Sequence, residues 1–422
     1  MTRLAPFLLM IVGCSGSSSV APPAVPPEPE PLPSKASKPR FETPKNRNFV
    51  FTAAPLDRAP TIRPINLPPF HAAAAVWGST GRDHRGHIYY GVSTDGDERL
   101  SAHLIEYDPA TGQATDRGGA VENLKRLGLA KPGENQNKIH TKIWQAADGW
   151  LHFASMDEGG ENEDGSKPPT FGSHLWRVRP EGGAWEHLAE VREAVIASAV
   201  GGKFVFYLGY FDHVLYRWDT ETGQLAGRVR VGSFGGHTTR NILADSRGHV
   251  FVPRVAADNV ELVEFDDMLR EVAAFPLADY DTAPNSSSHG LVGIAALKDD
   301  GFAFVTDRGR LYRLTPRATG TAIVDLGTIH PDGTCYCPSL VSWDGESVVA
   351  GLGRRQGSIA WEWLTVDLRT KRATVRAATI PGEGDGVLVY GSVTRDDDGR
   401  LYLGGRAVID GKSIAQAWAL AP

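Results

Sequence analysis

The segment Asp83-His84-Arg85-Gly86-His87-Ile88-Tyr89-Tyr90 joins a tight turn to an apolar run of β-branched and aromatic residues. The Asp/Gly step supplies the positive φ angles of a hairpin, and the run that follows is typical of a strand. Similar segments recur at a spacing of about 50 residues, which is the spacing of propeller blades. They begin at Asp148, Gly201, Asp245, Asp300, Asp344 and Asp398. One hairpin unit therefore repeats along most of the chain.

A third strand follows each hairpin in the same slot. These strands are Leu104–Asp108, Leu175–Arg179, Leu215–Asp219, Leu262–Asp266, Leu311–Thr315, Trp363–Asp367 and Ala417–Leu420. The first six copies continue into a fourth, outer strand such as Gln224–Val231 or Lys371–Ala377, whereas the seventh ends at Pro422. We predict an all-β fold, a seven-bladed β-propeller of four-stranded antiparallel blades. An N-terminal strand within Arg58–Pro68 is expected to complete the last blade and close the ring.

The N-terminus predicts export. Residues 1–13 combine Arg3 with an apolar run, and the run is far shorter than the ~20 residues of a membrane span. Ile11-Val12-Gly13-Cys14 resembles the lipobox of bacterial lipoproteins, which implies a lipid on Cys14; the alternative is an ordinary secretory signal. Residues 14–45 are rich in Ser and Pro and predict a tether, and residues 46–422 form the propeller.

Composition narrows the partners. The chain has 422 residues, 22% charged residues and a formal net charge of −6, which argues against nucleic acid. We expect a monomer that meets the membrane through its N-terminal lipid. The expected location is the bacterial cell envelope, at the outer membrane or cell surface, because Ser15 after the cysteine resembles the outer-membrane sorting pattern.

Polar side chains gather at or just before the innermost strands, where propeller sites form. They are His140-Thr141-Lys142, His237-Thr238-Thr239-Arg240, His289 and Cys335-Tyr336-Cys337. Each of them could instead satisfy backbone groups of neighbouring strands, but their clustering favours a site. A second set, His103, His174 and His213, occupies equivalent slots before third strands and is interpreted as mainly structural.

Two cysteines remain after Cys14, at Cys335 and Cys337. On an extended strand their side chains face the same side, and two thiolates with His330, His289 or His237 could hold a structural zinc ion. A strained disulfide and two free thiols are the alternatives. The predicted metal set is His289, His330, Cys335 and Cys337.

The segment His140–Gly149, the segment Gly172–Trp176, a tyrosine-bearing strand and Thr239-Arg240 resemble propeller polysaccharide lyases of the ulvan lyase kind. The likeness covers the second to fourth copies of the repeat. It implies that an arginine neutralises a uronate carboxylate while His and Tyr exchange protons, and it also implies a structural zinc. Carried over by position, Arg240 neutralises the carboxylate, His140 and His174 flank the scissile sugar, and Tyr207 or Tyr210 exchanges the proton. This sequence departs from the pattern in its acidic loop at Glu158–Pro169.

Three functions follow as hypotheses. The first is a lyase that cleaves uronate-containing glycans by β-elimination, which needs a neutralised carboxylate to make the α-proton acidic enough for a side-chain base. The second is a propeller that binds glycan or protein without turnover. The third is a metal-dependent hydrolase or lactonase, which would need a carboxylate-rich centre where this sequence has histidines and an arginine.

Overall fold

The structure is a computed structural model that describes residues 59–95, 100–256, 259–281, 290–317, 319–382 and 385–421. The chain divides into two compact units, residues 1–40 and 41–422, and all described residues belong to the second. The predicted signal peptide, Cys14, the tether and His289 lie outside the described residues. In the part of the chain that is described, no helix has the length and apolar character needed to cross a membrane.

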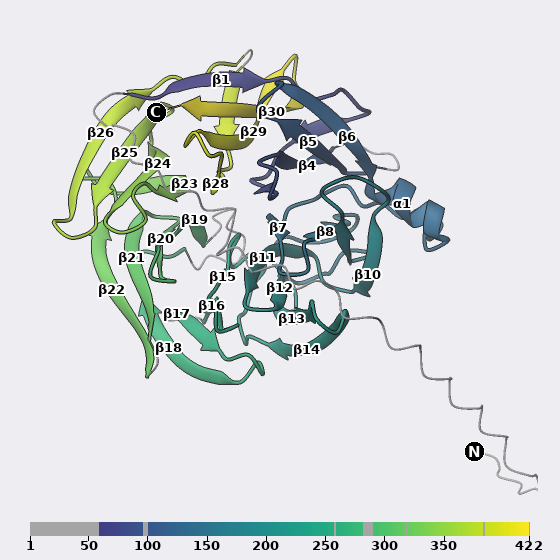
Figure 1. Cartoon of the computed structure of the whole chain (residues 1–422), viewed down its shortest axis with the longest axis horizontal. Coiled ribbons are helices and arrows are strands. Elements are labelled where there is room, and N and C mark those ends of the chain that lie inside the picture. The colour runs from purple at the N-terminus through teal and green to yellow at the C-terminus, as the bar shows by residue number, and fades with distance from the viewer. Residues whose placement is uncertain are drawn as a thin grey trace, which may run out of the picture. The chain divides into compact units, whose positions relative to one another are not determined.

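Antiparallel sheets surround a common centre (Figure 1). Four of them hold four strands each, in chain order from the innermost to the outermost. These sheets are β11(Val195–Gly201), β12(Phe204–Gly209), β13(Val214–Asp219), β14(Gln224–Arg230); β15(Leu243–Ala244), β16(Val250–Val255), β17(Val260–Phe265), β18(Glu271–Leu277); β19(Leu291–Ala296), β20(Phe302–Thr306), β21(Arg310–Arg317), β22(Gly320–Thr328); and β23(Cys335–Ser342), β24(Val348–Arg355), β25(Trp361–Asp367), β26(Arg372–Ala378). The repeated hairpins of the sequence thus form separate blades.

A fifth sheet joins the two ends of the described chain. It contains β1(Thr61–Ile65), β30(Lys412–Ala421), β29(Leu401–Ile409) and β27(Asp385–Val389), with β28(Thr394–Arg395) paired to β29. The register of β1 against β30 runs from Thr61 opposite Ala421 to Ile65 opposite Ala417. The two strands lie side by side in Figure 1. The prediction that a stretch within Arg58–Pro68 completes the last blade is confirmed.

The remaining sheet has nine strands, so the predicted count of seven blades is not confirmed by the sheets. Its path runs β10(Glu186–Val191), β9(Ser173–Val178), β8(Leu151–Met156), β7(Ile143–Gln145), β3(Thr80–Arg82), β4(Ile88–Thr94), β5(His103–Asp108), β6(Gln113–Gly119), with β2(Ala73–Ala75) on β4. Two four-stranded runs are fused because β3 pairs in parallel with β7 at Gly81–Ile143 and Arg82–Trp144. Gly81 permits this contact, since a Cβ there would lie 1.9 Å from the Ile143 carbonyl oxygen.

A short helix, α1(Ala120–Leu127), follows β6 and was not expected from the repeat. Its end is set by Gly128, whose φ of 71° places it in the left-handed region and whose N–H bonds to the carbonyls of Leu124 and Lys125. The helix buries Val121 and Leu124 against the sheet and presents Lys125 and Arg126 in its last turn. It lies at the periphery of the ring in Figure 1.

Apolar side chains fill the spaces between neighbouring sheets. One cluster joins Phe206 of β12 to Val252 of β16, and another joins Val305 of β20 to Val349 of β24. The second strands β12 and β20 are buried along their whole length, whereas outer strands such as β14 contain exposed and half-buried residues. The inter-sheet packing therefore fixes each blade and leaves the innermost loops to form a site.

Candidate functional site

Loops that enter or leave the innermost strands, together with one residue of β29, bring seven side chains together, and these seven are called the central cluster. Its members are Trp77, Lys138, His140, Lys142, Arg240, Tyr390 and Arg406. Trp77 lies between β2 and β3, the two lysines and His140 precede β7, and Arg240 precedes β15. Tyr390 follows β27, and Arg406 belongs to β29. The residues come from both ends of the described chain and from its middle.

The Trp77 indole is the centre of the cluster. Its ring lies 4.4 Å from the Tyr390 ring and stacks parallel to His140 at 6.1 Å between centroids. Three cations lie near its face, with Lys138 at 4.8 Å, Arg406 at 5.3 Å and Arg240 at 5.8 Å from the ring centroid. These distances are in the range of cation–π contacts. The arrangement combines a flat aromatic surface with several positive charges.

Arg240 is the most buried of these three cations, with 8% of its surface exposed. Its Nη1 donates to the Trp77 carbonyl oxygen at 3.5 Å, and its guanidinium lies 5.2 Å from the Tyr390 ring centroid. Burial lowers the pKa of Arg240, and the nearby Tyr336 and Tyr390 partly oppose that change. An arginine stays protonated in proteins, so the cluster holds a permanent positive charge in an aromatic setting.

His140 and Lys142 are buried beside this charge. Burial, together with the positive charges of Arg240 and Lys138, holds the pKa of His140 well below its usual range, so the imidazole is neutral. Its Nδ1 has no hydrogen-bond partner among the described residues. Lys142 Nζ donates to the Gly78 carbonyl oxygen at 2.6 Å, and burial with the Arg240 charge lowers the pKa of Lys142 to about 7. A neutral base and a titrating cation thus stand next to a fixed cation.

The acidic loop supplies carboxylates to this positive region. Glu158 forms an ion pair with Lys138, and the Tyr210 hydroxyl donates to Glu161. Burial raises the pKa of Glu161, and burial lowers that of Lys138, although each group partly stabilises the charge of the other. The loop packs closely on the segment before Arg240, because a Cβ at Gly236 would lie 1.7 Å from the Glu163 carbonyl oxygen. The loop therefore lies beside the central cluster.

The predicted catalytic residues lie in different surroundings. His140 and Arg240 belong to the central cluster, and Tyr210 is linked to it through Glu161. The Tyr210 ring also lies 4.1 Å from that of His237, whose pKa burial lowers to about 3. The sequence did not identify four members of the central cluster, namely Trp77, Lys138, Tyr390 and Arg406. The only sequence feature that indicated a role for the first three was their position beside inner strands, and Arg406 lies within β29.

His174 and Tyr207 are engaged in blade packing. His174 lies on the third strand β9, with Nε2 at 2.8 Å from Glu134 Oε1 and Nδ1 at 2.9 Å from His187 Nε2. Tyr207 is fully buried on β12, and its hydroxyl has no hydrogen-bond partner in the described part of the chain. None of these interactions joins His174 or Tyr207 to the central cluster.

The two other histidines of the equivalent third-strand slots also make internal contacts. His103 Nδ1 lies 2.8 Å from Asp116 Oδ2, and His213 Nε2 lies 3.0 Å from the Gly236 carbonyl oxygen. Both contacts are within or between neighbouring blades. They agree with the structural interpretation of this set.

Cys335 and Cys337 are buried free thiols within the apolar cluster between β20 and β24. Burial raises the pKa of Cys335 to about 12 and raises that of Cys337 well above its usual range. His330 Nδ1 accepts from the Asp332 backbone N–H at 3.0 Å, and its Nε2 lies 3.2 Å from Glu362 Oε2. The described donors do not converge within 4.8 Å as a zinc centre would require, and the remaining predicted ligand, His289, is outside the described residues.

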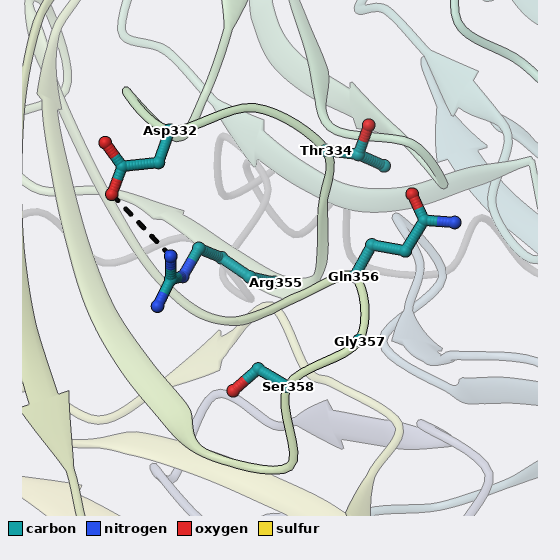
Figure 2. Close-up of a pocket in the computed structure, with 6 residues that line it drawn as sticks. All are labelled: Asp332, Thr334, Arg355, Gln356, Gly357 and Ser358. Carbon is teal, nitrogen blue, oxygen red and sulfur yellow. Dashed lines mark ion pairs between the residues drawn. The ribbon is translucent and has the colours of Figure 1, made fainter.

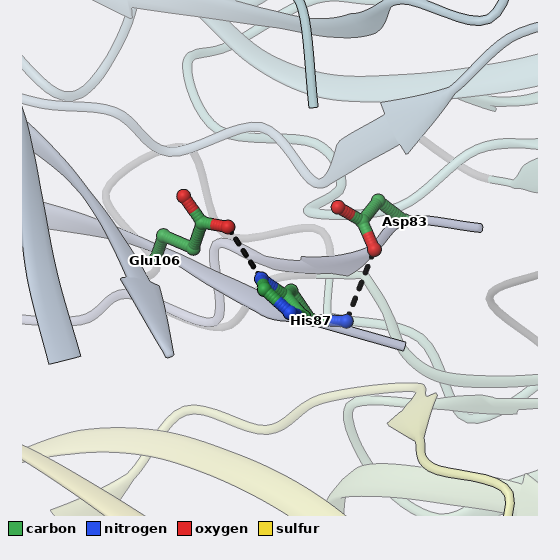
Figure 3. A group of neighbouring side chains, drawn as sticks. All are labelled: Asp83, His87 and Glu106. Atoms are coloured by element: carbon green, nitrogen blue, oxygen red, sulfur yellow. Dashed lines mark hydrogen bonds and ion pairs between the residues drawn. The ribbon is translucent and has the colours of Figure 1, made fainter. Parts of the chain in front are cut away.

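Among the described residues, one group has metal-like spacing, namely Asp83, His87 and Glu106 (Figure 3). Arg85 already supplies a cation there, with Nη2 2.7 Å from Asp83 Oδ2 and 2.6 Å from Glu106 Oε1. The same pattern recurs in another blade, where Arg247 and His249 contact Glu264 and Arg247 also contacts Asp245. Because the set recurs and already contains an arginine, we interpret it as a group of ion pairs that stabilises the Asp/Gly turn.

The closed ring of antiparallel sheets with polar residues at its centre defines an all-β propeller with four-stranded antiparallel blades. A solved structure of the WD40 β-propeller domain of Doa1 matches it with a TM-score of 0.51 and 12% identity, over 86% of this chain and 97% of that one. The structure of hydrazine synthase of Kuenenia stuttgartiensis matches with a TM-score of 0.49 and 8% identity, over 81% of this chain and 95% of that one. The structure of the Dos1 propeller matches with a TM-score of 0.46 and 9% identity, over 72% of this chain and 69% of that one. At such identities the Doa1 match supports the fold alone. No protein-family model and no curated protein matches this sequence.

Proposed function

We propose that the central cluster binds a carboxylate-bearing glycan. The observation that carries this proposal is the gathering of Lys138, Arg240 and Arg406 around the Trp77 indole. The C–H face of a sugar ring is apolar and packs on an aromatic surface, while a carboxylate accepts hydrogen bonds from guanidinium groups. Arginine is suited to this role because its planar donors match the two carboxylate oxygens.

We further propose that the bound uronate undergoes β-elimination. Arg240 neutralises the carboxylate, which makes the neighbouring C5 proton removable, and neutral His140 accepts that proton. The C4–O4 bond breaks as the C4=C5 double bond forms, and the leaving O4 takes a proton from Tyr210. Proton transfer by positioned groups contributes typically about 10²–10⁴-fold to a rate. The low pKa of His140 favours the base form, and the raised pKa of Tyr210 favours the protonated form that an acid needs.

Binding without turnover is the second candidate, and one observation favours it. The Tyr210 hydroxyl is already donated to Glu161, so it would have to leave that carboxylate before it could protonate a leaving oxygen. In this case the cluster would still bind an acidic glycan, with Arg240 as its main anchor.

The two candidates are separated by absorbance near 235 nm, where unsaturated uronates absorb. Purified full-length chain is incubated with a panel of uronate-containing polysaccharides, and binding is measured in parallel by calorimetry. Arg240→Ala and His140→Ala are the test variants, and Arg230→Ala, on a side chain that is 70% exposed, is the matched control. A rise that both test variants abolish supports a lyase. Binding without a rise, lost in Arg240→Ala alone, supports the binding propeller, and no binding to any polymer refutes both.

The nine-stranded sheet is proposed to represent two blades, which would give seven in all. Each half has four strands in the order of the other blades, and only two parallel residue pairs join the halves. Fast hydrogen exchange at the β3–β7 pairs with slow exchange within each four-stranded half would support this count, whereas equally slow exchange at the β3–β7 pairs would contradict it.

A further inference from the structure

A polar pocket of about 420 Å³ opens at the ends of β23 and β24. It is lined by Asp332, Thr334, Arg355, Gln356, Gly357 and Ser358 (Figure 2). Figure 2 shows Asp332 and Arg355 facing each other on one side, while Gln356 extends toward Thr334 on the other. The Gln356 backbone N–H donates to the Thr334 carbonyl oxygen at 3.0 Å, which ties the two segments together.

The strand that leads to the pocket packs beside the central cluster, because a Cβ at Gly391, next to Tyr390, would lie 1.9 Å from the carbonyl oxygen of Pro338 in β23. Tyr336 of β23 is paired with Arg354 of β24. Burial raises the pKa of Tyr336, and the charge of Arg240 partly opposes that rise. The pocket residues Thr334 and Arg355 lie two positions before Tyr336 and one position after Arg354. At about 3.3 Å per residue, Thr334 is roughly 7 Å along the strand from Tyr336. A chain-shaped ligand anchored at Arg240 would have to follow β23 past Tyr336 to reach the pocket.

The chemistry of the pocket differs from that of the cluster. Its one cation, Arg355, lies 3.8 Å from Asp332 and 3.4 Å from Glu362, so its charge is largely balanced. The other lining groups are two hydroxyls, an amide and a glycine. Such a set offers donors and acceptors for hydroxyl groups but little attraction for a second carboxylate.

We propose that this pocket is a second carbohydrate subsite that takes a neutral, hydroxyl-rich sugar unit of the same glycan whose uronate binds at Arg240. This inference rests on the proposed function and narrows it, because it assigns the ligand to polymers that contain both acidic and neutral sugars. Thr334 and Gln356 supply hydrogen bonds to the neutral unit, and Ser358 limits the pocket on the opposite side.

The test compares two ligands on the full-length chain by calorimetry. One is an oligosaccharide with alternating uronate and neutral units, and the other is an oligouronate of the same length. Thr334 and Gln356 are exposed, so the double variant Thr334→Val with Gln356→Ala is expected to fold normally. Loss of two hydrogen bonds should weaken the mixed oligosaccharide about tenfold. The oligouronate should bind within twofold of the wild-type affinity.

Two further variants keep the result decisive. Ser358→Trp fills the pocket and should reproduce the selective loss, while Gln224→Ala, on an exposed strand position of β14, should change nothing. If Arg240→Ala abolishes binding but both pocket variants bind the two ligands like the wild type, the subsite is wrong and the proposed function stands. Equal losses for both ligands also overturn the subsite. Binding that ignores Arg240→Ala, or no binding, overturns the proposed function and the subsite with it.

Discussion

Lys142 is predicted to make glycan binding depend on pH. Its pKa of about 7 arises mainly from burial and also from the Arg240 charge, and only its protonated form attracts an anion. A lowered pKa means that the lysine loses its charge as the pH rises through 7, so binding is strongest below that pH and weakens above it. The uronate itself stays ionised over this range, because carboxylic acids titrate near pH 4.

The size of the effect follows from the fraction of protein in the charged form. That fraction is about one half at pH 7 and about 1% at pH 9. The apparent Kd should therefore rise by at most about fifty-fold, or about 2.3 kcal/mol, which is the limit in which only the charged form binds. Burial also lowers the pKa of Lys138 and raises that of Glu161. As the pH rises, Lys138 therefore loses its positive charge and Glu161 gains its negative charge, so both weaken the attraction for an anion. The total slope in the wild type should therefore exceed that of Lys142 alone.

The assay is calorimetric titration with an oligouronate at pH 6, 7, 8 and 9, in two buffers that differ in ionisation enthalpy so that proton uptake is measured. Lys142→Arg keeps its charge over the whole range and should reduce proton uptake on binding at pH 8 by about one. Lys142→Met should show the same reduced uptake but bind more weakly at pH 6. If Lys142→Arg retains the wild-type pH slope, the assignment of a titrating Lys142 to this site is wrong.

Two other predictions test the acidic loop and the ring closure. Glu161→Gln should bind an oligouronate several-fold more tightly than the wild type at pH 8, because the substitution removes a negative charge beside the positive cluster. At pH 5, where Glu161 is protonated, the variant and the wild type should bind equally well. Calorimetry measures this with Glu181→Gln as an exposed control, and equal gains at both pH values would contradict it. Ile65→Ala should lower the free energy of unfolding in urea by about 2 kcal/mol, because Ile65 of β1 is 8% exposed and packs with residues of β4 and β5 and with residues of β29 and β30. Ile359→Ala, at 91% exposure, should stay within about 0.5 kcal/mol. An Ile65→Ala variant as stable as the wild type would show that β1 does not hold the ring closed.

The blade repeat was predictable because its signals are local. Each Asp/Gly turn and apolar run lies within a few residues, as at Asp148–Gly149, where Gly149 adopts a φ of 80°. The closing strand was also predictable, because a seventh copy with too few strands requires a partner from elsewhere in the chain. The number of separate sheets was not, since the β3–β7 pairing depends on how closely two blades approach at Gly81.

The site was only partly predictable. His140 and Arg240 stood out as polar residues next to apolar inner strands, but His174 and Tyr207, proposed by likeness to lyases, are held in blade packing by Glu134, His187 and the β12 surroundings. Trp77, Tyr390 and Arg406 carried no motif that marked them as partners of Arg240.

The sequence by itself determined the repeating hairpins, the closing strand and the polar character of the inner loops, because turn chemistry and the alternation of apolar residues act over short stretches. The tertiary structure alone decided which polar residues meet. Trp77 and Arg406 are separated by most of the chain, and they come together only when ring closure brings the first and last blades side by side. The same closure buries Arg240, His140 and Lys142 among one another, and this burial sets their protonation states.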